Sequence, residues 1–353
     1  MAERVIMKGN EALAEAAIQA GCRHFFGYPI TPQTEISAHM SKRMPKIGGT
    51  FLQAESEIGA INMVFGAASV GARAMTSSSS PGMSLKSEGI SYIAACDLPC
   101  VILNIQRGGP GLGSIQPAQQ DYYQATKAPG HGGFHTLVYA PCTVQEMVDT
   151  VFTAFDEAEK YLIPSMVLID GVLGQMMEPV TFPERDVKPS EKPWAVGPHI
   201  KKAARNIVNS LELEPELLEA SVLEREKKYR LIEKELPRAE SYKTEDAEIV
   251  VVGYGAAARI ARSAVDAARE QGIKAGLFRP ITLWPFPKDA LNSATKTVKS
   301  ILVTELSSGQ MIDDVRLATS CRLPVDFFGR TGGVISTPNE VLEAIKKSVG
   351  GAK

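Results

Sequence analysis

Two kinds of segment, distinguished by the spacing of their apolar positions, alternate along the first 180 residues. Short apolar runs, typical of buried strands, occur at residues 24–27, 49–53, 72–76, 100–106, 136–139 and 165–170. Between them, apolar positions spaced three or four apart predict helices at residues 9–20, 34–44, 57–68, 83–95 and 144–161. Strands that alternate with helices in this way predict a parallel sheet with helices on both faces.

The pattern changes after residue 180. Residues 181–246 begin as a proline-punctuated, charged stretch that predicts a linker, and they continue as one charged helix with an apolar stripe. The stripe comprises Leu217, Leu218, Val222, Leu223, Tyr229, Ile232 and Leu236. A second α/β unit follows in residues 247–353, with strands at 249–253, 274–278, 300–305 and 325–328 and helices at 256–271 and 339–348. The chain is therefore predicted to be α/β, with a larger doubly wound unit at residues 1–180 and a smaller one at 247–353.

The composition argues against nucleic-acid-binding and membrane proteins. The chain has 353 residues, of which 44% are hydrophobic and 22% charged, and its formal net charge is -2. This balance gives no general attraction for nucleic acid or for an anionic membrane surface. No apolar run reaches the length needed to span a bilayer. The N-terminus starts directly with a helical pattern in place of a signal peptide, so we expect a cytoplasmic protein.

Cysteine and histidine spacing predicts neither a disulfide framework nor a metal site. The five cysteines are irregularly spaced and form neither a C-x-x-C pair nor the four-cysteine run of a ferredoxin cluster. His131 and His135 are four residues apart but lie in a glycine-rich loop rather than on a helix. We therefore predict no metal on this chain, and we expect any iron–sulfur centre on another chain.

Candidate chemistry is sought in the loops that follow strands, because ligands of open parallel sheets bind outside the carboxyl ends of the strands. In "GYPITPQTEI", Thr31 stands where a helix N-cap belongs, Pro32 takes the first helical position and Pro29 stiffens the approach. Helix N-termini attract anions. Thr31 is therefore expected either to cap a helix or to present its hydroxyl group to a ligand.

Three further loops carry polar residues after a strand. In "QAESEIGAINM", Glu55 and Glu57 begin a helix, where the helix dipole favours carboxylates. In "TSSSSPGMSL", a serine run leads through Ser80 and Pro81 into the next helix. In "LNIQRGGPGLGSIQP", Arg107 ends an apolar strand and enters a glycine-rich loop. The planar fork of arginine suits a carboxylate, so Arg107 is the strongest binding candidate on chemistry alone.

A fifth loop is similar to a dinucleotide-binding motif but lacks one part of it. "VVVGYGAAARIA" contains G-x-G-x-x-A through Gly253, Gly255 and Ala258, after a strand and before a helix. A dinucleotide site also needs an acidic residue at the end of the next strand, where this chain has Arg279 and Pro280. The glycines are therefore interpreted as a tight turn between strand and helix.

Taken together, "FFGYPITPQTEI", "QAESEIGAINMVFGAASVGARAMTSSSSPGMSL" and "QRGGPGLGSIQPAQQDYYQA" resemble the α-type subunit of the 2-oxoacid:ferredoxin oxidoreductases, most closely the 2-oxoisovalerate, or branched-chain, subfamily. The resemblance covers nearly the whole chain, because "GYGAAARIA", "FRPITLWPFP" and "FGRTGG" match the family's transketolase-C-terminal-like domain. It implies that residues 1–180 form a pyrimidine-binding domain for thiamine diphosphate, residues 181–246 a linker with a charged helix, and residues 247–353 the transketolase-C-terminal-like domain.

The resemblance also implies a reaction and roles for individual residues. The family oxidatively decarboxylates a 2-oxoacid to acyl-coenzyme A and carbon dioxide, with coenzyme A as co-substrate and ferredoxin as electron acceptor. Glu57 would bond the aminopyrimidine ring nitrogen of thiamine diphosphate, and Pro29 and Ile30 would contact the cofactor. Thr31 would contact substrate and cofactor, and Arg107 would hold the substrate carboxylate.

The same resemblance implies partner subunits. Thiamine enzymes anchor the diphosphate and Mg²⁺ through a G-D-G stretch, of which "IDGVLG" at residues 169–174 lacks the first glycine. A β-type subunit is therefore expected to supply the diphosphate site and Mg²⁺, with 4Fe–4S clusters on partner subunits. A γ-type subunit and a ferredoxin-like subunit complete the expected assembly.

Two alternatives stay open. After Arg107 the next basic residue is Lys127, which favours a branched aliphatic substrate over 2-oxoglutarate, although a partner chain could supply the missing cation. A 2-oxoglutarate-type or pyruvate-type enzyme is therefore the first alternative. A non-catalytic binding subunit with a degenerate fold is the second.

Overall fold

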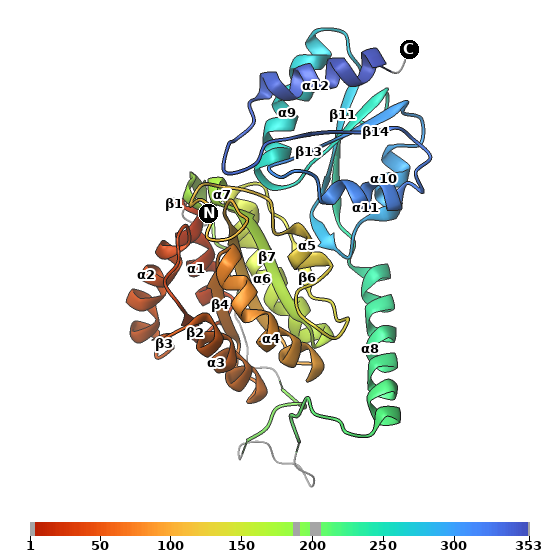
Figure 1. The fold of residues 1–353 in the computed structure, drawn as a ribbon. Coiled ribbons are helices and arrows are strands. Elements are labelled where there is room, and N and C mark those ends of the chain that lie inside the picture. The colour runs from red at the N-terminus through yellow and green to blue at the C-terminus, as the bar shows by residue number, and fades with distance from the viewer. Residues whose placement is uncertain (1–3, 186–190, 198–205, 352–353) are drawn as a thin grey trace.

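The structure is a computed structural model that describes residues 4–185, 191–197 and 206–351. It contains two α/β units, one above the other in Figure 1, with the long helix α8 (Pro215–Glu235) beside the larger, lower unit. The larger unit is built on a seven-stranded sheet and the smaller on a five-stranded sheet. A separate two-stranded sheet belongs to the larger unit. The α/β class predicted from the alternation of strands and helices is confirmed.

The larger sheet has the strand order β12-β6-β7-β5-β4-β2-β3. Its members are β2 (His24–Gly27), β3 (Thr50–Gln53), β4 (Ala74–Ser78), β5 (Cys100–Gln106), β6 (Leu137–Tyr139), β7 (Pro164–Asp170) and β12 (Thr282–Trp284). Strands β2 to β7 run parallel, and β12 adds an antiparallel edge beside β6. Every residue of β4, β5 and β7 is buried, as expected for central strands covered on both faces.

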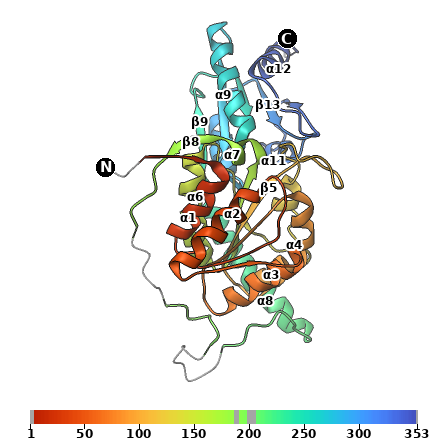
Figure 2. The same cartoon turned by 90° about the vertical axis from the view of Figure 1, so that its left-hand side faces the viewer.

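Helices cover both faces of this sheet (Figure 2). One face carries α1 (Gly9–Gln19), α2 (Thr34–Arg43) and α6 (Val144–Tyr161), in which α1 packs against the other two. The opposite face carries α3 (Glu57–Ser69) packed against α4 (Ser80–Ala95). Right-handed crossovers require this distribution, because the chain reverses its direction across the sheet after β3. The loops that leave the carboxyl ends of β2, β3, β4 and β5 consequently meet at one edge.

Several short elements escape the sequence pattern. They are the paired strands β1 (Val5–Lys8) and β8 (Met177–Val180), the 3₁₀ helix η1 (Met44–Ile47), and the helices α5 (Tyr122–Thr126), α7 (Gly171–Gln175), α10 (Lys288–Ala294) and α11 (Met311–Ala318). Segments this short hold too few apolar positions to establish a period. Among the predicted helices, α4 begins three residues early because Ser80 and Pro81 form its first turn.

The smaller sheet has the order β14-β13-β10-β11-β9. Its strands are β9 (Ala239–Tyr242), β10 (Ile249–Val252), β11 (Ala275–Pro280), β13 (Ser300–Glu305) and β14 (Val325–Gly329), all parallel except the edge strand β9. Helices α9 (Gly255–Glu270) and α12 (Pro338–Gly351) pack against each other over it. Strand β9 precedes residue 247 but joins this sheet, and β12 follows it but joins the larger one. The domain boundaries at residues 181 and 247 stay a prediction.

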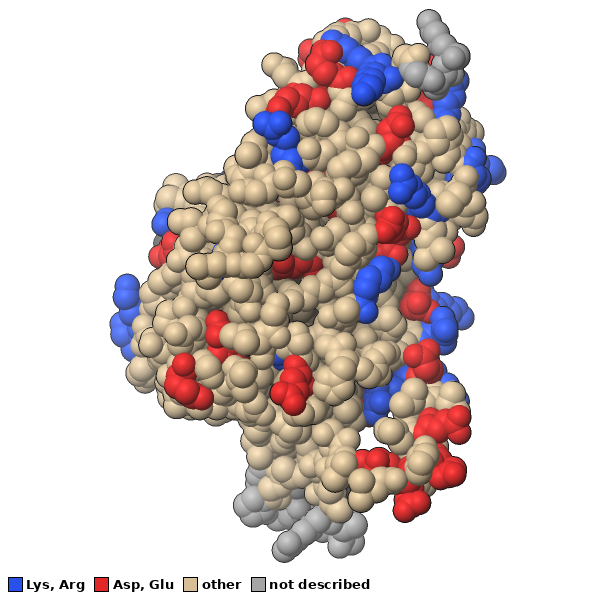
Figure 3. Space-filling model, viewed as in Figure 1, with Lys and Arg blue, Asp and Glu red and all other residues tan. Residues whose placement is uncertain are grey.

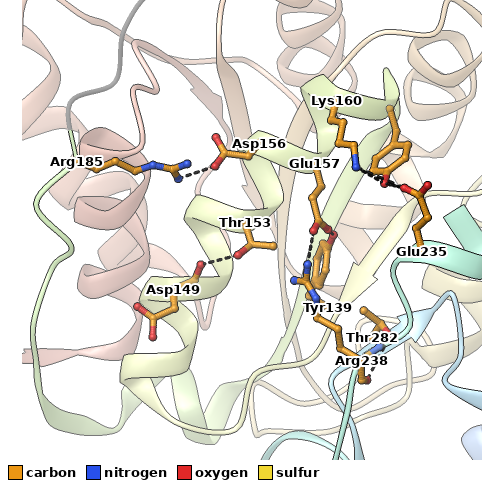
Figure 4. A network of polar contacts seen from close by, with 11 residues as sticks. Tyr139, Asp149, Thr153, Asp156, Glu157, Lys160, Arg185, Glu235, Arg238 and Thr282 are labelled. Atoms are coloured by element: carbon orange, nitrogen blue, oxygen red, sulfur yellow. Dashed lines mark hydrogen bonds and ion pairs between the residues drawn. The ribbon is translucent and has the colours of Figure 1, made fainter. Parts of the chain in front are cut away.

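Polar contacts join α6, the end of α8, the residues between α8 and β9, and the start of β12 (Figure 4). The backbone N–H of Arg238 donates to Thr282 Oγ1 at 2.9 Å, and the Arg238 guanidinium pairs with Glu157 on α6. The Tyr161 hydroxyl, at the end of α6, donates to Glu235 Oε2 on α8 at 2.5 Å. These contacts hold the two units in one arrangement at the point where β12 crosses from one to the other.

The apolar stripe of α8 is only partly covered. Tyr229, Ile232 and Leu236 are buried, whereas the residues of the first half, Leu217, Leu218, Val222 and Leu223, are exposed. The stripe predicted from the sequence therefore packs against this chain only over the last turns of the helix. The helix begins at Pro215.

Candidate active site

The turn that contains Thr31 does not cap a helix, so that part of the sequence interpretation is wrong. The Gln33 N–H donates to the Ile30 carbonyl at 3.2 Å, which closes a turn over residues 30–33, and α2 begins only at Thr34. Its N-cap position is Gln33, without a side-chain cap. Thr31 is exposed, as is Pro29, and Ile30 is half-buried. Thr31 therefore lies at the surface of the turn.

Buried amide side chains hold this turn in place. Asn10 Nδ2, from α1, donates to the Pro32 carbonyl at 2.8 Å. Gln33 Nε2 donates to the Tyr28 carbonyl at 3.3 Å, and Gln33 Oε1 accepts from Ser77 Oγ on β4 at 2.6 Å. Because Asn10 and Gln33 are fully buried, these bonds are shielded from water and fix the turn against the sheet. Neither residue was a candidate from the sequence.

Glu57 is nearly buried at the first position of α3, with 6% of its surface exposed. Ser56 provides the N-cap, accepting the Gly59 N–H at 3.1 Å, so the helix start does not depend on the Glu57 side chain. Within the described ranges, no hydrogen-bond donor is found for the Glu57 carboxylate. A low-exposure carboxylate with spare acceptor capacity is unusual, since buried polar groups are normally paired.

The first turn of α4 supports this carboxylate. A Cβ atom at Gly82 would lie 2.6 Å from Glu57 Oε1 and 2.2 Å from Ser78 Oγ, so only glycine allows the carboxylate to rest against the helix backbone. The preceding hydroxyl groups of Ser78 and Ser79 are buried and lack a partner among the described residues. The serine-rich loop of the sequence is thus the end of β4 and the start of α4, packed beneath Glu57.

Lys86 lies one helical turn after Gly82 and is fully buried. Its Nζ donates to Thr76 Oγ1 at 3.0 Å and to the Glu57 carbonyl at 3.5 Å. Burial lowers the pKa of Lys86 to about 8, against the opposing effect of the Glu57 charge. Lys86 was not a candidate from the sequence. Its signal was a lysine on the helix face that also carries Gly82 and Gly89, where apolar or small residues are expected.

Arg107 joins two loops of the site. Its Nη1 donates to the Thr31 carbonyl at 3.0 Å and its Nη2 donates to the Leu112 carbonyl at 3.0 Å. The side chain is 6% exposed, and its Nε is buried without a partner in the described chain. The guanidinium group therefore brings the Thr31 turn and the glycine-rich loop together, a role that the sequence did not indicate. Its proposed contact with a substrate carboxylate stays a prediction.

A buried acid behind Arg107 also escaped the sequence analysis. Asp121 Oδ2 accepts from Ser80 Oγ at 2.7 Å and from Asn104 Nδ2 at 3.0 Å. Ser80 Oγ in turn accepts the Arg107 N–H at 3.0 Å. Desolvation raises the pKa of Asp121 despite these hydrogen bonds. The start of α4 is consequently the common support of the site, because Ser80 binds the Arg107 backbone and Gly82 contacts Glu57.

The dinucleotide-like motif and the "IDGVLG" segment are bonded to each other through Asp170. Asp170 Oδ2 accepts the Ala256 N–H at the start of α9 at 2.8 Å, and Asp170 Oδ1 accepts the Leu173 N–H at 3.2 Å. A Cβ atom at Gly255 would lie 2.7 Å from Asp170 Oδ2. The helix N-terminus that a dinucleotide would use is thus bonded to this carboxylate. The same bonds leave Asp170 unsuited to hold a metal or a diphosphate.

The two histidines that are four residues apart face different neighbours. His131 lies 3.5 Å from Ser91 Oγ through Nε2, whereas His135 stacks on Trp284 with ring centroids 4.4 Å apart. In the described ranges no three side chains of His, Cys, Asp or Glu are grouped so as to hold a metal ion. None of the helices there combines the length and the apolar character needed to cross a membrane.

Comparison with known proteins assigns the family. The profile of the thiamine diphosphate-binding region of pyruvate flavodoxin/ferredoxin oxidoreductases matches residues 15–250, and that of core domain II of pyruvate:ferredoxin oxidoreductase matches residues 247–341. The chain belongs to this oxidoreductase family. The resemblance inferred from its motifs is therefore confirmed.

Relatives of this oxidoreductase family match the chain over nearly its whole length. Ketoisovalerate oxidoreductase subunit VorB is 46% identical in Methanothermobacter marburgensis and 47% identical in Methanothermobacter thermautotrophicus, each over 98% of both chains. The 2-oxoglutarate synthase subunit KorA of Methanothermobacter thermautotrophicus is 36% identical over 98% of this chain and 99% of its own.

Two solved structures share the fold. A 2-oxoglutarate:ferredoxin oxidoreductase from Magnetococcus marinus, determined with 2-oxoglutarate, coenzyme A and succinyl-CoA bound, superimposes with a TM-score of 0.89 at 26% identity. That match covers 98% of this chain, which spans 65% of the solved chain. A split-gene transketolase superimposes with a TM-score of 0.62 at 14% identity, which shows likeness of fold alone.

The residues of the site fit the pyrimidine end of thiamine diphosphate. The Glu57 carboxylate has spare acceptor capacity, low exposure and a backbone support at Gly82, so a protonated ring nitrogen can bond to it. Asp170 is bonded to backbone N–H groups and does not fit the diphosphate and its metal. The described chain therefore matches one end of the cofactor and not the other.

Proposed function

We propose that the chain is the α-type, pyrimidine-binding subunit of a thiamine diphosphate-dependent 2-oxoacid:ferredoxin oxidoreductase that acts on a branched-chain 2-oxoacid such as 2-oxoisovalerate. The products are the acyl-coenzyme A and carbon dioxide, with electrons delivered to ferredoxin. The observation that carries the proposal is the Glu57 carboxylate in a chain of this family. Glu57 is 6% exposed, its carboxylate has no hydrogen-bond donor among the described residues, and it rests against Gly82.

Each site residue has one task in this proposal. Bound thiamine diphosphate supplies the carbon nucleophile that attacks the 2-oxoacid. Glu57 holds a proton at the pyrimidine ring nitrogen and so orients the cofactor, while Pro29 and Ile30 line the cofactor. Thr31 directs its hydroxyl group at the reacting carbonyl, and Arg107 neutralises the substrate carboxylate. The bonds of Arg107 to the Thr31 and Leu112 carbonyls support this, because they keep its charge beside Thr31 before substrate arrives.

A β-type subunit completes the cofactor site by supplying the diphosphate and Mg²⁺ contacts. An apolar rim supports this part of the proposal. Large apolar side chains are exposed around the site, namely Tyr28, Leu52, Ile58, Leu85, Leu112 and Ile115. The corresponding face, over α4 and the loop after β5, carries few charged side chains in Figure 3. Exposed apolar surface of this extent is typical of a subunit interface.

The electron-transfer centres belong to partner subunits in this proposal. All five cysteines of the chain are free of disulfide bonds. Burial raises the pKa of the Cys22, Cys100 and Cys142 thiols to about 12. The thiolate is the form that binds a metal, so thiols with such a high pKa are poor cluster ligands. The 4Fe–4S clusters therefore lie on the β-type and ferredoxin-like subunits, beside a γ-type subunit. Free thiols also support a reducing, cytoplasmic location, and the proposal includes neither nucleic acid nor membrane as a partner.

The glycine-rich loop supports a branched aliphatic substrate. Residues 108–116 carry no charge, and Leu112 and Ile115 are exposed there. The next cation, Lys127, is paired with Asp314 at 2.5 Å. A dicarboxylic substrate needs a second cation, which these residues do not supply. The relatives that act on 2-oxoglutarate keep that substrate as the second candidate.

The test is reconstitution with the partner subunits and assay across a panel of 2-oxoacids. We expect ferredoxin reduction that requires thiamine diphosphate and coenzyme A, with the highest kcat/KM for 2-oxoisovalerate. A highest kcat/KM for 2-oxoglutarate would select the second candidate. An assembled complex that binds thiamine diphosphate through its partners but keeps its full activity in the Glu57→Ala variant would show that this chain is a non-catalytic binding subunit.

A further inference from the structure

A buried lysine beside the cofactor acid has no explanation in the packing of the helices. Lys86 is fully buried where α4 meets α3, and Gly89 on the same face of α4 is in close contact with Ile61. Burying an ammonium group is costly, and an unbranched apolar side chain of similar volume usually replaces a buried charge without loss. If the side chain at position 86 only filled space, methionine would therefore pack there as well as lysine does.

The partners of Lys86 indicate what the charge does. Strand β4 presents the neutral hydroxyl of Thr76, and α3 presents the carbonyl of Glu57, so the ammonium group lies against the residue whose side chain fits the cofactor. Among the described residues, Glu57 is the charged group that acts on Lys86. In this weakly screened environment a cation favours the ionised form of a neighbouring carboxylate and opposes a second positive charge nearby.

We propose that Lys86 is a positioning residue whose buried charge, held against the Glu57 carbonyl, lowers the pH at which the pyrimidine nitrogen bound to Glu57 releases its proton. This inference rests on the proposed function, since it concerns thiamine diphosphate held by Glu57. Lys86 touches neither the reacting atoms nor the solvent. It acts through Glu57, and it lowers the pKa of the bound pyrimidine nitrogen toward neutral pH.

The first measurement needs no cofactor. Between pH 8 and 10.5 Lys86 is neutral in the folded chain but protonated in the unfolded one, because its ordinary pKa is 10.5 and its folded pKa is about 8. The unfolded state then binds more protons, so the free energy of unfolding rises with pH across this window. Denaturant unfolding at several pH values should show this rise in the wild type, and the Lys86→Met variant should lack it. Equal slopes in both proteins would overturn the buried, charged state of Lys86.

The second measurement uses the assembled complex with thiamine diphosphate. Near-ultraviolet circular dichroism of the bound pyrimidine, followed against pH, reports its protonation. In Lys86→Met we expect the midpoint to move upward by about one pH unit or more, because the opposing cation is gone. Lys127→Met is the matched control. It removes a lysine that pairs with Asp314 outside the site, and its midpoint should equal that of the wild type.

The outcomes separate the inference from the proposed function. Bound cofactor with the same midpoint in wild type and Lys86→Met overturns the role of Lys86 and leaves the function standing. A wild-type complex that binds no thiamine diphosphate overturns both. If Lys86→Met fails to fold, Lys86→Gln gives the same readout, because glutamine keeps a donor for Thr76 and loses the charge. A midpoint that rises in either variant supports the inference.

Discussion

Glu57 owes its chemical character to three neighbours rather than to its place at a helix start. Ser56 caps α3, so the carboxylate is released from that task. Gly82 gives it a backbone support, and Lys86 lies against its carbonyl. A helix-start glutamate whose only role is favourable interaction with the dipole needs none of these neighbours.

Replacing Glu57 by glutamine separates the two roles. The side chain is nearly isosteric, so loss of the dipole interaction should change the free energy of unfolding by only about 0.3–1 kcal/mol. An amide does not hold a proton at the pyrimidine nitrogen as a carboxylate does, so kcat of the assembled enzyme should fall roughly 10²–10⁴-fold. Thermal melting and steady-state rates of Glu57→Gln test this. Turnover within about threefold of wild type, under 1 kcal/mol of barrier, would return Glu57 to a structural role.

Arg107 combines charge with a two-pronged geometry, and Arg107→Lys retains only the charge. Lysine cannot donate to the Thr31 and Leu112 carbonyls in the same directions, so both loops lose a charge-assisted bond and the substrate loses its fork. At roughly 1.5–3 kcal/mol for such a bond, we expect kcat/KM for every 2-oxoacid to fall on the order of 10–100-fold. Binding of thiamine diphosphate, measured by calorimetry on the complex, should not change. Unaltered kinetics would reduce Arg107 to a loop residue.

At the level of elements, the approach of α3 to α4 sets the site. Gly82 and Gly89 lie on the face of α4 that meets α3, and a Cβ atom at either one would collide, with Glu57 at the first and with Ile61 at the second. The end of β4 delivers Ser78 beneath the same point, where the hydroxyl lies within 2.2 Å of a Cβ at Gly82. The closeness of two helices and a strand end therefore determines where the Glu57 carboxylate lies.

Gly82→Ala tests this packing, with Gly66→Ala as its matched control. Gly66 is also helical, but a Cβ atom there meets nothing within 4 Å, so alanine should raise the free energy of unfolding by about 0.5–1 kcal/mol and leave activity unchanged. At Gly82 the new methyl group displaces the Glu57 carboxylate. We expect no gain in stability and at least a roughly tenfold loss of kcat, on the order of 1.4 kcal/mol of barrier. Normal rates in Gly82→Ala would show that the position of the carboxylate is not critical.

At the level of the whole molecule, the described chain fits one end of the proposed cofactor site. The loops of the larger sheet gather Thr31, Glu57 and Arg107, whereas the acidic residue of "IDGVLG" is committed to the start of α9. The contact of Asp170 with α9 joins the two units, and so does the entry of β12 into the larger sheet. The chain therefore uses for its own cohesion the groups that another thiamine enzyme would use for a metal.

We expect the isolated chain to bind thiamine diphosphate weakly or not at all. The diphosphate carries most of the charge of the cofactor, and without a metal and its ligands that charge is not compensated. Isothermal titration of the purified chain in Mg²⁺ buffer should show no micromolar binding, while the complex with its partner subunits should bind. Micromolar affinity of the chain alone would contradict the division of the site between subunits.

Local sequence was sufficient for most of the strands and helices of the two sheets and for the family. Apolar spacing located β2 and β5 within the observed bounds because strand and helix periods are properties of neighbouring residues. The motifs around Thr31, Glu57 and Arg107 identified the family for a similar reason. Each is a short segment, so its residue types can be recognised without knowledge of the fold.

Tertiary structure alone decided the features that depend on residues far apart in the chain. The turn at Thr31 is closed by Gln33 and held by Asn10 and Ser77, so it does not become the helix cap that its prolines predict. Asp170 binds α9 across 86 positions, and Lys86 becomes a buried cation only because α3 and β4 enclose it. Burial, electric field and partner choice arise from packing between distant segments, and no local period records them.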